Sequence, residues 1–291
     1  MNFCSRVSIA RHEYFAGTGV RGQAYVFLPV PKRLWHDKEM NSHWAEREEL
    51  QAIRAARQAG VVARLYNPRP RDATEEAPLL VHACEDLPAP GLAPLVELLG
   101  RRWRIDQTGR PRIAVCTHGT RDRCCAKFGF AAYQAACRLV EEGVSPFEPI
   151  ETSHLGGDRF AATGIFFPSG SMYAHLGDLD LGALCTAEAE GRVDPARYRG
   201  RVFDPQVVQL VRAGLARQGL VNDATAPIAI TPKGPCDLEA SVGGGRFHVR
   251  LRVAEVEFYS SCVALSARRP SHGTRTVFDH AEPLDLPARS G

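Results

Sequence analysis

Apolar and polar residues follow one another along the chain in a pattern typical of a mixed α/β protein. Short apolar runs rich in β-branched and aromatic residues predict strands, and longer segments with one apolar face predict helices. In the first third of the chain these segments are strands at 22–29, 61–66 and 78–83 and helices at 42–59 and 91–99. Their order is strand, helix, strand, strand, helix.

The same order of elements returns after residue 111. The second set consists of a strand at 112–115, a helix at 126–142, a strand at 147–152, a hairpin with strands at 163–167 and 172–176, and a helix that begins near 178. Because the order repeats, we expect two related α/β halves, residues 1–105 and 106–220. A further helix is expected to open with Asp204 as its N-cap and Pro205 at its first helical position.

The last part of the chain, residues 221–291, has a different pattern. Segments 227–232, 247–258 and 262–267 are rich in β-forming residues, and polar and apolar residues alternate within the middle segment. This alternation predicts a strand with one buried and one solvated face. The run Gly243-Gly244-Gly245 stands between β-rich segments and therefore favours a hairpin turn over a phosphate-binding loop. We expect a small β-rich C-terminal appendage.

Composition narrows the class of protein. A chain of 291 residues with 44% hydrophobic content supports a packed core, and a net charge of +3 without a long basic block does not indicate nucleic-acid binding. No apolar run approaches the roughly 18 residues of a membrane helix, and Arg6, Arg11 and Glu13 stand where a signal peptide would be apolar. Nine cysteines, two of them adjacent, suit a reducing compartment. We therefore expect a cytoplasmic protein.

Two loops carry the candidate chemistry, and each follows a predicted strand. The first loop has Cys116 and Cys125 with eight residues between them, and the second has His154 and, four positions later, Asp158. If the loops lie side by side, these side chains form a metal site. Two thiolates and an imidazole favour an iron-sulfur cluster or zinc over calcium or magnesium, which prefer oxygen ligands.

The strings CTHGTRDRCC, HLGGDRFA and FFPSGSMYAHL resemble the sucrase/ferredoxin-like family. The resemblance implies a thioredoxin-like ferredoxin domain with a [2Fe-2S] cluster in the second half. The first half lacks the paired cysteine loop and keeps only Cys4 and Cys84, so we interpret it as a degenerate, cluster-free thioredoxin-like partner. In the bis-histidinyl members of that family the ligands are two cysteines in C-x8-C and two histidines in H-x3-H. Cys116, Cys125 and His154 match this pattern, and Asp158 stands in place of the second histidine. The resemblance therefore implies these four residues as cluster ligands.

The fourth ligand and the choice of thiols have alternatives. A carboxylate oxygen is a hard donor for a sulfide-bridged iron. Asp158 therefore either binds the metal, pairs with Arg121 or Arg159, or accepts backbone N–H bonds in the glycine turn. His118 lies on the same loop as both thiols and is the alternative donor. Cys124 is the alternate thiol, but adjacent residues seldom point at one metal, and we interpret it as a packed thiol.

Cys137 and Cys185 stand among apolar residues of predicted helices, and we interpret them as core residues. The other cysteines have no partner at a ligand spacing, and we interpret them as structural; they are Cys4, Cys84, Cys236 and Cys262. The chain has no Cys-x-x-Cys motif, which argues against a thioredoxin-type dithiol enzyme.

The sequence thus predicts a cytosolic [2Fe-2S] protein that transfers single electrons, and a carrier more than an enzyme. Its partner would be a redox protein, either a reductase or an acceptor, and not nucleic acid or a membrane. Basic residues around the two loops would attract an acidic partner; they are Arg121, Arg123, Lys127 and Arg159. The alternatives are a zinc-binding thioredoxin-like protein with a structural or hydrolytic role and a metal-free thioredoxin-like binding module.

Overall fold

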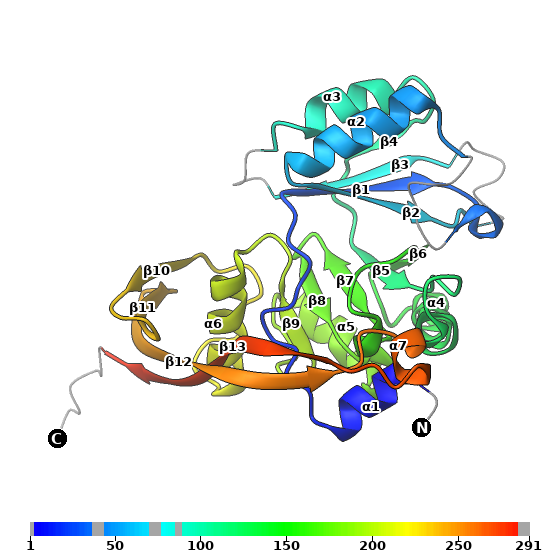
Figure 1. Ribbon diagram of the computed structural model, residues 1–291. Helices are drawn as coiled ribbons and strands as arrows, with labels where there is room; N and C mark the ends of the chain where they lie inside the picture. The colour runs from blue at the N-terminus through cyan, green and yellow to red at the C-terminus, as the bar shows by residue number, and fades with distance from the viewer. Residues whose placement is uncertain (1–2, 37–43, 70–76, 85–88, 285–291) are drawn as a thin grey trace.

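The computed structural model describes residues 3–36, 44–69, 77–84 and 89–284. These residues form a mixed nine-stranded sheet with helices and a separate antiparallel sheet of four strands (Figure 1). The expected mixed α/β class and the β-rich C-terminal segment are therefore confirmed. Within the described ranges, no helix has both the length and the apolar character needed to cross a membrane.

The first half has the expected order of elements. They are β1 (Ala24–Pro29), α2 (Arg47–Gln58), β2 (Val61–Tyr66), β3 (Leu79–Ala83), α3 (Leu92–Leu99) and β4 (Ile105–Asp106). Strand β1 runs parallel to β2 and antiparallel to β3. Helix α2 begins at residue 47, where the Glu46 backbone N–H donates to the Glu49 carboxylate at 2.8 Å. Two residues of the longer helix that we expected, 42 and 43, lie outside the described residues.

The second half repeats this arrangement and extends it. Its elements are β5 (Arg112–Cys116), a π-helical turn (Cys125–Gly129), α4 (Phe130–Glu141), β6 (Glu148–Thr152), β7 (Gly164–Phe167), β8 (Ser171–Tyr173), α5 (Leu181–Ala189), β9 (Tyr198–Arg201) and α6 (Gln206–Arg217). Strand β5 is parallel to β6 and antiparallel to β7, as β1 is to β2 and β3. The sheet order is β4-β3-β1-β2-β6-β5-β7-β8-β9. The halves meet edge to edge through one residue pair, Tyr66 with Thr152.

The two halves also pack face to face across a shared core. Phe167 of β7 stacks on His82 of β3 at 4.3 Å between ring centroids, and it lies 5.5 Å from Tyr25 and 5.7 Å from Phe27 of β1. Apolar side chains of α2 and α3 cover the other face of the first half, and those of α4, α5 and α6 cover the other face of the second. The nine-stranded sheet therefore has a helical layer on each outer side (Figure 1).

The C-terminal sheet contains β10 (Ile228–Pro232), β11 (Asp237–Val242), β12 (Gly245–Phe258) and β13 (Ser271–Pro283). Gly243 and Gly244 both have positive φ and form the expected turn between β11 and β12. The segment expected to be β-rich at 262–267 is instead the short helix α7 (Cys262–Ser266). It begins there because the Ser261 hydroxyl accepts a hydrogen bond from the Ala264 N–H at 3.1 Å.

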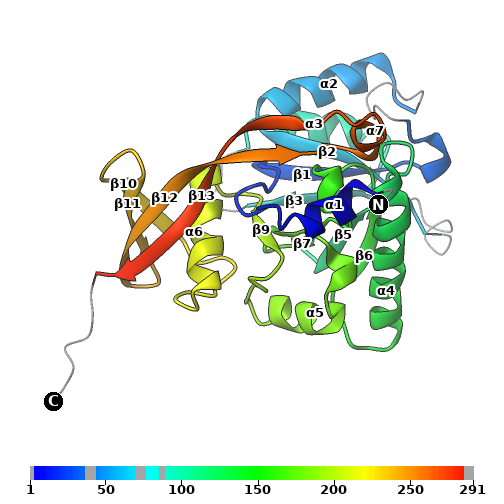
Figure 2. The same cartoon turned by 60° about the horizontal axis from the view of Figure 1, so that its bottom comes forward.

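Helix α7 joins β12 to β13 and does not lie with the rest of the appendage. The β12–β13 hairpin crosses the second half and carries α7 to the N-terminal helix α1 (Cys4–Ala10), which the sequence pattern did not indicate (Figure 2). The N-terminal helix α1 and the α7 connection of the C-terminal hairpin thus meet at one corner of the second half.

The prediction of Asp204 as the N-cap of α6 was wrong by one residue. Pro205 occupies the N-cap position and the helix begins at Gln206. The Asp204 carboxylate is engaged elsewhere, because it pairs with Arg212 at 2.9 Å and with Arg201 at 3.3 Å.

A buried carboxyl group lies under the β7–β8 hairpin. Glu188 of α5 is 5% exposed and accepts hydrogen bonds from the Tyr173 hydroxyl and, at 2.9 Å, from the Ser169 hydroxyl. Burial raises the pKa of Glu188 from 4.5 to about 7, although these hydrogen bonds oppose the shift.

We predict that this residue makes stability fall between about pH 4.5 and pH 7. In that range the unfolded chain releases a proton that the folded protein keeps, so rising pH favours the unfolded state by a total on the order of 3 kcal/mol. Glu188→Gln should flatten this part of the profile, measured as the free energy of unfolding in urea at each pH. Glu190→Gln is the control, because Glu190 lies at the surface. An equal slope in the wild type and Glu188→Gln would contradict the prediction.

Candidate metal centre

The first loop is shaped by a helix cap at Asp122. Its carboxylate accepts a hydrogen bond from the Cys124 N–H at 2.8 Å, so helical structure begins at Arg123. The helix that we expected from residue 126 therefore starts three residues earlier. Cys124 and Cys125 both lie in the first turn, and consecutive residues of a helix point in different directions.

A glycine lets the following turn rest on the end of β5. The π-helical turn Cys125–Gly129 passes so close to the strand that a Cβ on Gly129 would lie 2.0 Å from the Cys116 carbonyl oxygen. The turn brings the Cys125 thiol beside the Cys116 thiol. Single π-helical turns of this kind occur frequently at functional sites.

The second loop follows β6 and turns sharply at two glycines. Gly156 has a φ of 93° and Gly157 a φ of 80°, a region that other residues seldom adopt. The buried Arg199 guanidinium donates to the Gly156 carbonyl at 2.9 Å and holds this bend in place. The turn places His154 and Asp158 on the side that faces the first loop.

Side chains from the two loops form a closed ring of four donors, which we call the four-donor ring. Cys116 contacts both Cys125 and His154. The Cys125 thiol lies 3.8 Å from Asp158 Oδ1, and His154 Nδ1 lies 3.0 Å from the same oxygen. The two thiols and the carboxylate are buried, while the His154 side chain is 24% exposed. The structure therefore brings together the four residues that the sequence singled out.

The contacts within the ring shift the pKa values of its members in different directions. The hydrogen bond from Cys125 holds the pKa of Cys116 well below its usual range, with a further contribution from His154, and the same bond raises the pKa of Cys125. Burial would lower the pKa of His154, but its contacts with Asp158 and Cys116 outweigh burial and raise it to about 9. A metal that bound in this ring would displace the protons that these donors hold.

His118 and the neighbouring arginines occupy defined places around the ring. His118 Nδ1 accepts a hydrogen bond from the His154 N–H at 3.3 Å, so this nitrogen orients the second loop. Arg121 Nε lies 3.7 Å from Asp158 Oδ2. Arg159, the other pairing candidate for Asp158, instead forms an ion pair with Glu13.

A buried polar network from both halves supports the ring behind Cys116, and the sequence pattern did not indicate it. The Glu151 carboxylate accepts hydrogen bonds from the Thr117 hydroxyl at 2.9 Å and from the Asn67 side chain at 2.8 Å. The Lys32 ammonium forms an ion pair with Glu151 and lies 3.0 Å from the Thr117 hydroxyl. Lys32, a cation of the first half, therefore contacts Thr117, the residue that follows Cys116 in the sequence.

Cys124 belongs to a second group of thiols, which we call the cysteine trio. Its Sγ lies 3.5 Å from Cys4 Sγ and 3.2 Å from Cys262 Sγ, and the latter two are 3.7 Å apart. With Asp122, the trio offers four ligand atoms within 4.8 Å of one another, a geometry that can hold a metal ion. Our interpretation of Cys4 and Cys262 as isolated thiols missed this group, because their partners are distant in the sequence.

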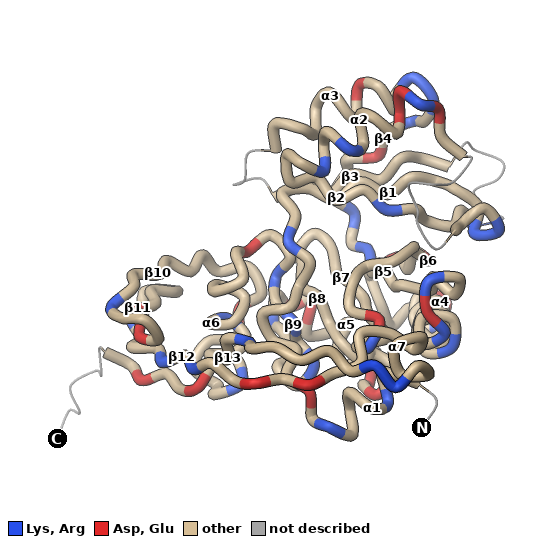
Figure 3. The backbone as a smooth tube through the Cα atoms, viewed as in Figure 1, with Lys and Arg blue, Asp and Glu red and all other residues tan. Residues whose placement is uncertain are grey.

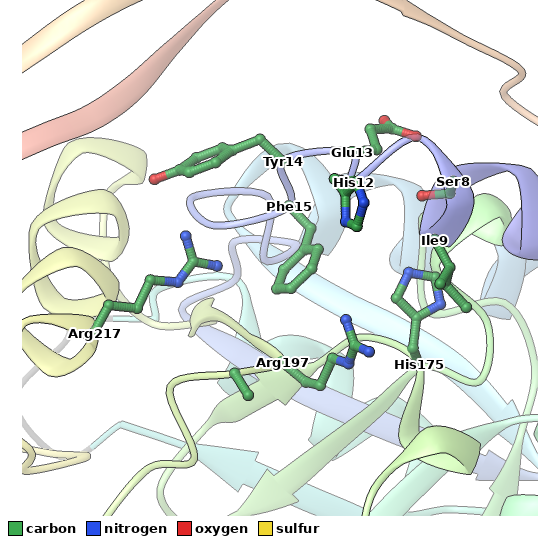
Figure 4. A pocket seen from close by; sticks show the side chains of 10 residues that line it. Ser8, Ile9, His12, Glu13, Tyr14, Phe15, His175, Arg197 and Arg217 are labelled. Atoms are coloured by element: carbon green, nitrogen blue, oxygen red, sulfur yellow. The ribbon is translucent and has the colours of Figure 1, made fainter.

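A cavity of about 310 Å³ lies on another side of α1 (Figure 4). His12, Phe15, His175, Arg197 and Arg217 are among the residues that line it. Burial lowers the pKa of His175 to about 4. The imidazole is therefore neutral at physiological pH and packs edge-on against the Phe15 ring at 6.1 Å.

Comparison with protein families agrees with the motif analysis. A model described as sucrase/ferredoxin-like matches residues 16–207, which is well over half of the 291 residues. The chain belongs to the sucrase/ferredoxin-like family. All members of the four-donor ring fall inside the region that matches this family, whereas Cys4 and Cys262 of the cysteine trio fall outside it. No curated protein and no solved structure is significantly similar to the chain.

We predict that Gly129→Ala lowers the free energy of unfolding by about 1–3 kcal/mol. Alanine normally stabilises a helix relative to glycine, but here its Cβ would meet a backbone carbonyl at 2.0 Å, and the clash outweighs the gain. Urea unfolding measures the difference. Gly177→Ala is the control, because a Cβ there meets nothing within 4 Å. Similar stability of the two variants would show that the turn does not depend on this close approach.

Proposed function

We propose that the four-donor ring binds a [2Fe-2S] cluster and that the protein transfers single electrons. The observation that carries the proposal is the meeting of Cys116, Cys125, His154 and Asp158 in one ring built from two loops. When bound there, such a cluster would supply one-electron redox chemistry, which the side chains alone lack.

The chemistry of the donors fits this cofactor. Thiolates are the usual ligands of iron-sulfur clusters, and histidines replace two of them on one iron in Rieske centres. Cys116 and Cys125 form an adjacent sulfur pair, and His154 and Asp158 form an adjacent nitrogen and oxygen pair. His154 Nδ1 is buried and lies 3.0 Å from Asp158 Oδ1 without the geometry of a hydrogen bond, so a metal would satisfy it better.

Each of these residues would have a distinct effect on the cluster. An imidazole in place of a thiolate makes the site less negative and raises the reduction potential. Asp158 would restore a negative charge, which the Arg121 guanidinium at 3.7 Å partly balances. His154 is the most exposed of the four donors and therefore provides the shortest route to a partner at the surface.

A basic surface beside the ring supports an acidic redox protein as the partner. Arg121, Arg123 and Lys127 are exposed on the turn that leads into α4, and Arg268 and Arg269 are exposed after α7 (Figure 3). The Arg123 side chain donates to the Ser266 hydroxyl of α7 at 3.1 Å, which joins the two groups into one surface. Charge of one sign accelerates association with a partner of the opposite sign. Arg159 is not part of this surface, because it is mostly buried beside Glu13.

The topology of the second half supports a thioredoxin-like domain. Its β5–α4–β6 unit is parallel, and β7 then joins β5 in the antiparallel sense. The first half has the same arrangement without paired cysteines, and it would serve as a cluster-free partner that contributes Lys32. We also propose a cytoplasmic location, since nine free cysteines suit a reducing compartment.

We predict that Cys116→Ser and Cys125→Ser each abolish cluster assembly. Each removes one of the two thiolates in the ring, and a hydroxyl is a poor replacement. The measurement is the visible spectrum after anaerobic purification, together with iron and acid-labile sulfide per chain. Cys137→Ser and Cys185→Ser are the controls and should retain the wild-type spectrum. A wild-type protein that contains zinc in the ring, or no metal there, would refute the iron-sulfur proposal.

We predict that Asp158 determines how long the cluster survives. Imidazole is a softer donor than carboxylate, so Asp158→His should slow loss of the visible absorption in a chelator, and Asp158→Ala should speed it by about 10-fold or more. Asp279→Ala, which removes an exposed carboxylate of the C-terminal sheet, is the control. Identical spectra and lifetimes in the wild type and both Asp158 variants would remove Asp158 from the ligand set. His118→Ala would then test the alternative donor.

A further inference from the structure

We propose that the cysteine trio is a second metal site, in which Cys4, Cys124 and Cys262 bind one zinc ion. This site is separate from the four-donor ring, and the proposal does not depend on the iron-sulfur cluster. Its role is structural: the ion joins the N-terminal helix and the C-terminal hairpin to the loop that carries Cys125.

The spacing of the three sulfur atoms suits a single tetrahedral ion. Zinc-sulfur bonds of about 2.3 Å place the sulfurs of a tetrahedral site about 3.8 Å apart. The three Sγ–Sγ distances here are 3.2, 3.5 and 3.7 Å. Movements of a few tenths of an ångström would therefore admit the ion. A two-iron cluster would need a wider site, because its sulfide-bridged core separates the ligands of one iron from those of the other.

A disulfide explains the trio less well. The sulfur atoms of a disulfide are about 2.05 Å apart, so even the closest pair, Cys124 and Cys262, would have to approach by more than 1 Å. Such a bond would also leave Cys4 buried beside it as an unpaired thiol. A metal ion, by contrast, uses all three sulfurs at close to their present spacing.

The surroundings of the trio are arranged for a bound cation. All three thiols are at most 1% exposed, and they come from α1, the first turn after Asp122, and α7. The buried Asp122 carboxylate accepts the backbone N–H groups of Cys124 at 2.8 Å and Cys262 at 2.6 Å, so one side chain positions two of the ligands. An oxygen of the same carboxylate lies within 4.8 Å of all three sulfurs and can take the fourth position. A buried carboxylate next to three thiols favours a positive ion over three neutral thiols.

The two adjacent cysteines, Cys124 and Cys125, face different sites. Cys125 faces Cys116 and Asp158, whereas Cys124 faces Cys4 and Cys262. The Ser5 hydroxyl donates to Cys124 Sγ at 3.3 Å, which fixes that thiol on its own side. One helical turn therefore supplies a ligand to each of two sites.

The test is the metal content of single-cysteine variants, measured per chain by mass spectrometry after purification without chelator and with zinc in the growth medium. The wild type should hold about one zinc ion. Cys4→Ser, Cys124→Ser and Cys262→Ser should each lose it while they keep the visible spectrum of the ring. Cys116→Ser should show the reverse, and the buried Cys185→Ser should keep both. Zinc absent from the wild type, or retained in all three trio variants, would overturn the proposal.

A second measurement tests the trio without changing its cysteines, in case the trio variants fail to fold. In the Cys116→Ser protein, Co²⁺ offered in place of zinc should give the intense visible bands and the thiolate-to-cobalt charge-transfer band of a tetrahedral thiolate site. A pale octahedral spectrum would overturn the proposal. Alkylation under non-reducing conditions, read by intact mass, should modify three more thiols after zinc removal than before it. A disulfide within the trio would likewise overturn the proposal. Failure of the iron-sulfur proposal would leave these zinc results unchanged, so the two are distinguishable.

Discussion

The position of the two adjacent cysteines depends on the Asp122 carboxylate. One oxygen caps the helical turn through the Cys124 N–H, and the other binds the Cys262 N–H of α7. The cap sets where the helix begins, and the helix sets the directions of Cys124 and Cys125. If the turn began one residue later, the Cys125 side chain would no longer point at the Cys116 thiol. Cys124 would likewise no longer point at the other two thiols of the trio. A single buried carboxylate therefore aligns both groups of donors.

The first half of the chain contributes to the site although it lacks the paired cysteines. Its β1 and β3 side chains pack face to face with Phe167, next to the strand that ends at Cys116. Lys32 reaches across to Glu151 and Thr117 directly behind that cysteine. Phe167 pairs with Arg112, the first residue of β5, so this core also positions the strand that leads to Cys116. The first half therefore supports the ring without supplying a donor to it.

Local patterns predicted much of this fold, and long-range contacts account for what they missed. The strand at 61–66 and the hairpin after Thr163 follow from apolar periodicity, and the pairing of the two loops follows from their positions at strand ends. The prediction of a β-rich segment at 262–267 was wrong, because a β-rich composition does not reveal a helix cap such as Ser261. The trio was missed because Cys4 and Cys262 come together only when the β12–β13 hairpin folds back across the second half. The domain boundaries at 105 and 220 stay predictions.

The sequence separation within the trio has a consequence for how the protein is made. Cys124 and Cys262 are 138 positions apart, and Cys4 and Cys262 are 258 apart. During synthesis on the ribosome, the Asp122 turn emerges long before its partner in α7, and contacts of such separation form late. The α7 side of the corner around Cys124 therefore closes only after α7 itself has been made.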